Sequence, residues 1–127
     1  NVYKNLKDLD NAIKCYYKSF EIDPTYVFGI YTVGSTYYDR AIEIQEEINA
    51  LDVNDYETYD KLIAEFEKAL LDAIDPFEKA FAATNDKEFQ LAIADGLKQI
   101  YFRFRDKDPK YQEGFEKYNS FLEANEE

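Results

Sequence analysis

The sequence predicts an all-α fold. Apolar side chains recur at steps of three and four residues along almost the whole chain, as is typical of helices with one buried face. The alternation of apolar and polar residues that marks a half-buried strand is nearly absent. With 127 residues, only 4 Gly and 3 Pro, and no low-complexity linker, the chain is expected to form one domain of packed helices.

The first helix is predicted to end at Asp23-Pro24-Thr25, and two long helices follow it. In both long helices the apolar steps alternate between four and three without a break. The first series is Ile30, Gly34, Tyr37, Ala41, Ile44, Ile48 and Leu51. The second series is Tyr59, Ile63, Phe66, Leu70, Ala73, Phe77 and Ala80. Two such seams predict an antiparallel helix pair.

Three later helix starts are marked by capping residues. Asn54 and Asn85 each have a glutamate three residues later, which is the spacing of a capping box. Asp108 places a capping carboxylate before Pro109, a residue that suits the first position of a helix. We therefore expect helices to begin after each of these residues, the last one running to Leu122. Its inner side is predicted to carry Tyr111, Phe115, Tyr118 and Phe121.

Pro76 lies inside the second long helix. A proline there removes a backbone hydrogen bond and costs about 3 kcal/mol. The residues around it could instead restart a helix. The apolar register continues from Ala73 through Phe77 to Ala80, and so we expect a kink rather than a break.

An internal repeat determines the architecture. Residues 9–24 carry a small residue, an aromatic, a small residue and a proline at Ala12, Tyr16, Ser19 and Pro24. This spacing resembles the second helix of a tetratricopeptide repeat, a unit of about 34 residues built from two helices. The further matching positions are Tyr3, then Ile30, Val33, Gly34 and Tyr37, then Ala73, Phe77 and Ala80, and finally Ala94, Leu97 and Tyr101, although Lys98 stands where a small residue is usual.

The resemblance implies a tetratricopeptide-like solenoid of helical hairpins, an α-α superhelix, with one departure from the family pattern. Between Asp39 and Ala73 lie 33 residues, where the family has about six. Because the helical register never breaks, we expect both helices of this repeat to be longer by about 20 Å. An elongated second repeat of this kind is similar to that of some bacterial tetratricopeptide-like proteins, and this likeness implies no biochemical function.

The repeat pattern suggests how the single domain of residues 1–127 is divided. Residues 1–24 are expected to be the second half of a truncated repeat, residues 25–85 a repeat with an extended hairpin, and residues 86–127 a divergent terminal helix pair. The chain starts within a repeat and without methionine, and so we expect it to be part of a longer protein. The sequence indicates no compartment.

The composition argues against several classes of function. There are 27 acidic and 15 basic residues, for a net charge of −12, which disfavours nucleic-acid binding. With no histidine and one cysteine, His-dependent catalysis, internal disulfides and Cys- or His-rich metal sites are not expected. No apolar run reaches the roughly 20 residues of a membrane helix. We expect a soluble, non-enzymatic domain without a metal or other cofactor.

The predicted hairpin is strongly acidic. Residues 39–60 contain eight acidic residues against Arg40 alone, a net charge of −7. Two interpretations remain open: a solvated helical face that keeps the protein soluble, or a docking surface for a basic partner.

The family resemblance implies a ligand groove on the concave side, lined by the first helix of each repeat. By offset, its candidate residues are Phe28, Tyr31, Ser35 and Tyr38 in one helix and Ala92, Asp95, Gln99 and Phe102 in the other. Aromatic side chains there would offer apolar contact area with a polar tip. The alternative is that neighbouring helices cover them.

The predicted function is a non-catalytic protein–protein interaction module that binds a peptide or a partner helix in this groove. The alternative is a self-associating scaffold. Without an upstream partner helix, the first helix would leave some of its apolar residues open to a second copy. These candidates are Ile13, Tyr16, Tyr17 and Phe20.

Overall fold

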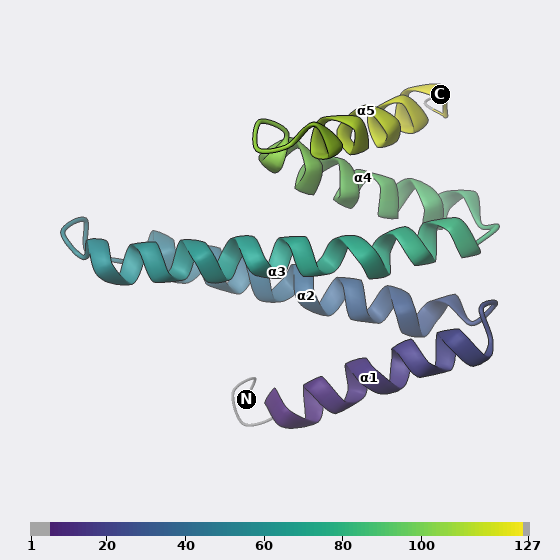
Figure 1. Ribbon diagram of the computed structural model, residues 1–127, viewed down its shortest axis with the longest axis horizontal. Helices are drawn as coiled ribbons and strands as arrows, with labels where there is room; N and C mark the ends of the chain where they lie inside the picture. The colour runs from purple at the N-terminus through teal and green to yellow at the C-terminus, as the bar shows by residue number, and fades with distance from the viewer. Residues whose placement is uncertain (1–5, 126–127) are drawn as a thin grey trace.

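Five helices form the fold in the computed structural model, which describes residues 6–125, with side chains from residue 10 onward. They are α1 (Leu6–Ile22), α2 (Val27–Asn49), α3 (Tyr56–Ala83), α4 (Lys87–Phe104) and α5 (Pro109–Ala124). Each helix packs on the next one in the chain, and Figure 1 shows the resulting row. The described residues contain no strand, and the predicted all-α fold is confirmed. Tyr3 lies outside these residues.

The helix pair α2–α3 is the longest part of the molecule. These helices have 23 and 28 residues, against 16 to 18 in the other three. Figure 1 shows their shared tip extending beyond the ends of α1, α4 and α5. The buried seam is largely the predicted one, from Ile30 to Ile44 on α2 and from Phe66 to Ala80 on α3. The assignment of Tyr59 to the seam is wrong, because its side chain is 46% exposed near the tip.

Gly34 allows α2 and α3 to approach closely. A Cβ atom at Gly34 would lie 2.5 Å from Cδ1 of Phe77, well inside van der Waals contact. The buried Phe77 ring also lies beside Tyr31 and Tyr38, with centroid distances of 5.9 and 6.3 Å. Phe77 is therefore a central packing residue of the long helix pair, as the repeat spacing predicts.

α3 is helical through Pro76, so the chain neither breaks nor restarts there. Pro76 is buried, and Ala73, Phe77 and Ala80 around it are buried as well. The burial of this apolar stretch offsets the cost of the lost backbone hydrogen bond.

Two of the predicted helix caps are off by one residue. Asp55, not Asn54, caps α3 by accepting a hydrogen bond from the Thr58 N–H at 3.2 Å. Asn54 still belongs to the turn, where its N–H donates to Asp52 at 2.9 Å. Asp86, not Asn85, caps α4 through the N–H groups of the second and third residues after it. The predicted cap at Asp108, followed by Pro109, is confirmed.

One carboxylate of α3 holds α4 and α5 in place. Glu78 Oε2 accepts hydrogen bonds from the hydroxyl groups of Tyr101 on α4, at 2.7 Å, and Tyr118 on α5, at 3.0 Å. The two tyrosine rings stack with a centroid distance of 5.9 Å. Gly114 leaves room for the Tyr101 ring, because a Cβ there would approach it to 2.6 Å.

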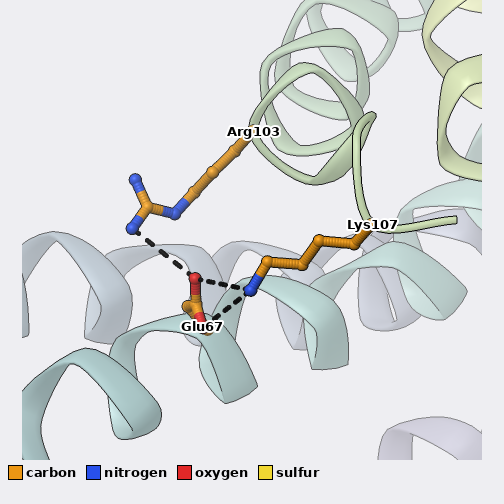
Figure 2. A network of polar contacts seen from close by, with 3 residues as sticks. All are labelled: Glu67, Arg103 and Lys107. Carbon is orange, nitrogen blue, oxygen red and sulfur yellow. Dashed lines mark hydrogen bonds and ion pairs between the residues drawn. The ribbon is translucent and has the colours of Figure 1, made fainter. Parts of the chain in front are cut away.

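A second polar link joins α3 to the end of α4. Figure 2 shows Glu67 facing Arg103 and Lys107, whose nearest nitrogens lie 3.7 and 3.3 Å from Oε2. The Arg103 guanidinium also lies 4.6 Å from the centre of the Phe66 ring. The cations are partly exposed, and such pairs contribute at most about 1 kcal/mol each. Their main effect is to fix where α4 ends relative to α3.

We expect the protein to lose stability above pH 10. Burial raises the pKa of Tyr101 and Tyr118 above the ordinary value, and Glu78 raises both pKa values further. Below pH 10, both tyrosines keep their protons whether the chain is folded or unfolded. Above pH 10, the unfolded chain releases these protons while the folded chain retains them, so the free energy of unfolding falls as pH rises.

Urea unfolding between pH 8 and about 11.5 measures this effect. The variant with Tyr101→Phe and Tyr118→Phe should lose stability less steeply over the alkaline range than the wild type. Equal slopes would show that these two tyrosines do not cause the alkaline loss.

Candidate protein-binding surface

One face of α2 carries a stripe of aromatic and apolar side chains. Phe28, Tyr31, Ser35 and Tyr38 share this face because they follow one another at steps of three and four residues. Phe28 is 64% exposed, whereas the other three are half-buried. Ile42 is 47% exposed and continues the stripe by one further turn. The stripe therefore has exposed apolar ends and a partly covered centre.

α4 runs in the same direction as α2, and α3 lies between the two helices in Figure 1. The rings of Tyr31 and Phe89 meet with a centroid distance of 4.7 Å. About two turns further along, burial raises the pKa of Tyr38, and the charge of Asp95 on α4 raises it further. The contact between Tyr31 and Phe89 shows that the α2 stripe meets the first turn of α4 through side chains.

The polar candidate residues of α4 lie further along the helix than Phe89. Asp95 and Gln99 are exposed, and the Gln99 side-chain amide donates to Asp95 Oδ2 at 3.0 Å. Ala92 is also exposed on the same stripe. Asp95 and Gln99 thus offer exposed hydrogen-bonding groups on α4.

Phe102 has a different environment from the other candidates. It is half exposed, lies 5.4 Å from the Phe115 ring of α5, and has the Arg105 guanidinium 3.7 Å from its ring centre. The structure thus joins Tyr31 to α4 through Phe89, pairs Asp95 with Gln99 within α4, and places Phe102 near α5.

Two residues of this surface, Ile42 and Phe89, were not predicted from the sequence. The family offset ends at Tyr38, but the step of four residues from Tyr38 to Ile42 signals that the stripe continues. Phe89, which packs on Tyr31, falls outside the offset positions of α4. Tyr31 and Tyr38 are therefore partly packing residues, while Phe28 and Ile42 are freer to contact a partner.

The predicted self-association residues lie on α1 and pack towards α2 and α3. Ile13 is buried, so the expectation that it is open to a second copy is wrong for this residue. Tyr16, Tyr17 and Phe20 are half-buried. The Tyr16 ring lies over Gly29 of α2, and the Tyr17 hydroxyl donates to Asp75 of α3 at 3.1 Å.

The described residues carry neither a candidate membrane span nor a candidate metal cluster. None of the helices combines the length and the hydropathy that a membrane crossing requires. Within the same part of the chain, no three Cys, Asp or Glu side chains gather closely enough to hold a metal ion.

The row of antiparallel helices defines the class as an all-α protein built from helical hairpins. A tetratricopeptide-repeat family model matches residues 1–26, which contain α1 and the turn to α2. Comparison with curated proteins and with solved structures found no match. The family match over residues 1–26 and the five helices together support a tetratricopeptide-like protein. Such repeats generally mediate protein–protein interactions, and the family is typically non-catalytic.

Proposed function

We propose that this chain is a non-catalytic interaction module that binds a peptide or a partner helix over the adjoining faces of α2 and α4. The observation that carries the proposal is the exposure of large apolar side chains at Phe28 and Ile42, at the two ends of the α2 stripe. Exposed apolar side chains that lie along one face of a helix can bind an extended segment or an amphipathic helix of a partner.

The centre of the surface supports the same function. Tyr31 and Tyr38 rest on Phe77 and so are held in place before a partner arrives. Aromatic side chains with fixed positions lose little conformational freedom on binding, which favours them as interface anchors. Asp95 and Gln99 would select partner groups that donate hydrogen bonds.

The same proposal includes the division of the chain into repeats. Residues 1–24 are the second half of one repeat, residues 25–85 a full repeat with an extended hairpin, and residues 86–127 a divergent terminal pair. The helix order α1, then α2–α3, then α4–α5 supports this division. The binding surface then uses the first helix of each of the last two units.

Partner capture from a lysate of the cells that make the protein tests the function. The variant with Phe28→Ser and Ile42→Ser should retain at least about tenfold less of the partner than the wild type, because both exposed anchors are lost. Ile22→Ser is the matched control, since Ile22 is 76% exposed but lies outside the stripe. Circular dichroism must first show equal helix content in all three proteins.

Two outcomes would contradict the proposal. Equal capture by all three proteins would place the contact elsewhere. Recovery of the chain alone, with a mass in sedimentation that rises with concentration, would favour the scaffold function through Tyr16, Tyr17 and Phe20.

A further inference from the structure

The tip of the α2–α3 hairpin carries an apolar pocket of about 360 Å³. Its apolar lining comes from the end of α2, the connecting turn and the start of α3: Ile48, Leu51, Val53, Tyr56 and Tyr59. Val53 is 85% exposed and Tyr56 is 70% exposed. Val53 and Tyr56 are too exposed to contribute to the core. Exposed apolar side chains beside a pocket are typical of a binding surface.

No other helix of the described chain contacts this tip. α2 packs on α1 and α3, and Figure 1 shows that the tip extends past the near end of α1. α4 and α5 end well short of it as well. The pocket therefore faces solvent, and it is separate from the surface that Phe28 and Tyr31 mark near the other end of α2.

The pocket lies in the most acidic stretch of the chain. Residues 41–60 contain no Lys or Arg and seven acidic residues, namely Glu43, Glu46, Glu47, Asp52, Asp55, Glu57 and Asp60. Asp52 and Asp55 themselves line the pocket. An apolar pocket inside a strongly negative surface is complementary to a segment that is both basic and apolar.

We propose that the hairpin tip is a docking site for a basic segment of a partner protein, which inserts an apolar side chain into this pocket. The inserted side chain packs against Leu51, Val53 and Tyr56, and it removes exposed apolar surface from water. Flanking Lys or Arg side chains of the partner pair with the surrounding carboxylates. They can also lie over the exposed faces of Tyr56 and Tyr59.

Charge argues against a second copy of this chain as the occupant. The protein has a net charge of −12, and the tip is one of its most negative regions. Two copies repel each other over a distance, whereas a basic segment is attracted and guided to the tip. A partner of opposite charge is therefore the occupant that the tip fits.

Peptide binding measured by fluorescence anisotropy at physiological ionic strength tests the proposal. The probe is a short labelled peptide with Lys and Leu in an amphipathic pattern. One comparison peptide replaces each Leu by Ser, and another replaces each Lys by Glu. We expect the Lys–Leu peptide to bind at least about tenfold more tightly than either, because the pocket and the charge act together.

Protein variants then locate the bound peptide. The variant with Val53→Ser and Tyr56→Ser should lose at least about tenfold in affinity, since both exposed apolar anchors are removed. Glu57→Gln with Asp60→Asn should lose about threefold to tenfold. Glu21→Gln with Glu113→Gln makes the same change in net charge away from the tip and should change the affinity less than about twofold.

Three results would overturn the proposal. Equal affinity loss in the two charge variants, with none in the variant with Val53→Ser and Tyr56→Ser, would mean that the peptide responds only to total charge. Loss of binding in the variant with Phe28→Ser and Ile42→Ser, with the tip variant unaffected, would place the peptide on the α2–α4 surface instead. A concentration-dependent mass that only the variant with Val53→Ser and Tyr56→Ser abolishes would identify a second copy as the occupant.

Discussion

Phe77→Ala is expected to lower the free energy of unfolding by about 3–5 kcal/mol. The Phe77 ring is buried between α2 and α3. It packs against the rings of both Tyr31 and Tyr38 on α2. Its removal deletes apolar contacts and leaves a cavity beside Gly34 of α2. Urea unfolding followed by circular dichroism measures the loss.

Phe28→Ala is the control for this prediction, because it removes the same atoms from a ring that is largely exposed on α2. It should change the stability by no more than about 0.5 kcal/mol. A cost for Phe77→Ala as small as that of Phe28→Ala would contradict the packing described for the hairpin.

Gly34→Ala tests the same contact from the opposite helix. The new methyl group would meet the Phe77 ring, and we expect a loss of about 1–3 kcal/mol from overpacking. Combined with Phe77→Ala, the substitution should cost less than the sum of the two single changes, because the methyl group enters the vacated space. Additive costs would show that the two positions are not in contact.

Tyr118→Ala is expected to cost a similar amount, about 3–5 kcal/mol. Tyr118 is buried, packs edge-on against Phe81 at 5.3 Å, stacks on Tyr101 and donates to Glu78. Through Glu78 and Phe81, this side chain ties α5 directly to α3, although the backbone of α5 packs mainly on α4. In the Tyr118→Ala variant, the amides of α5 should therefore lose more protection from hydrogen exchange than the amides of the other helices.

Two further variants separate packing from hydrogen bonding at this position. Tyr118→Phe keeps the ring but removes one hydrogen bond to a carboxylate, and should cost about 1.5–3 kcal/mol. Tyr56→Ala truncates a tyrosine that is mostly exposed, and should stay within about 0.5 kcal/mol of the wild type. If Tyr118→Ala were no more costly than Tyr56→Ala, α5 would not be anchored by this residue.

The long helix pair was predicted well because its buried residues recur at helical spacing in the sequence. The seam from Ile30 to Ile44 and from Phe66 to Ala80 repeats at steps of three and four, as the apolar series of the sequence does. The same register predicted that the helix continues through Pro76.

The helix starts were predicted less accurately because neighbouring residues can both act as caps. Asn54 and Asp55 each have a side-chain oxygen that could accept the required hydrogen bond. The choice depends on the turn, where Asp52 holds the N–H of Asn54 and so delays the start of α3 by one residue. Such a local hydrogen bond leaves no periodic signal in the sequence.

The two candidate binding surfaces were predicted only in part. Tyr31 and Tyr38 follow from the repeat offset, but their packing on Phe77 and Phe89 depends on how α2, α3 and α4 come together. The tip pocket was not predicted. By spacing, Tyr59 belongs to the apolar seam, and so it was expected to be buried between the two helices rather than to line a pocket. Exposure near the tip depends on whether a third helix packs there, and among the described residues none does; spacing carries no information about that.

Site-specific photocrosslinking tests the central functional claim most directly. A photoreactive phenylalanine analogue is placed singly at Phe28, Ile42 or Ile22, all of which are exposed. In a lysate, we expect positions 28 and 42 to crosslink to the same partner protein and position 22 to give no such product. Crosslinking from position 22 alone, or crosslinks only between copies of this chain, would contradict binding over the α2–α4 surface.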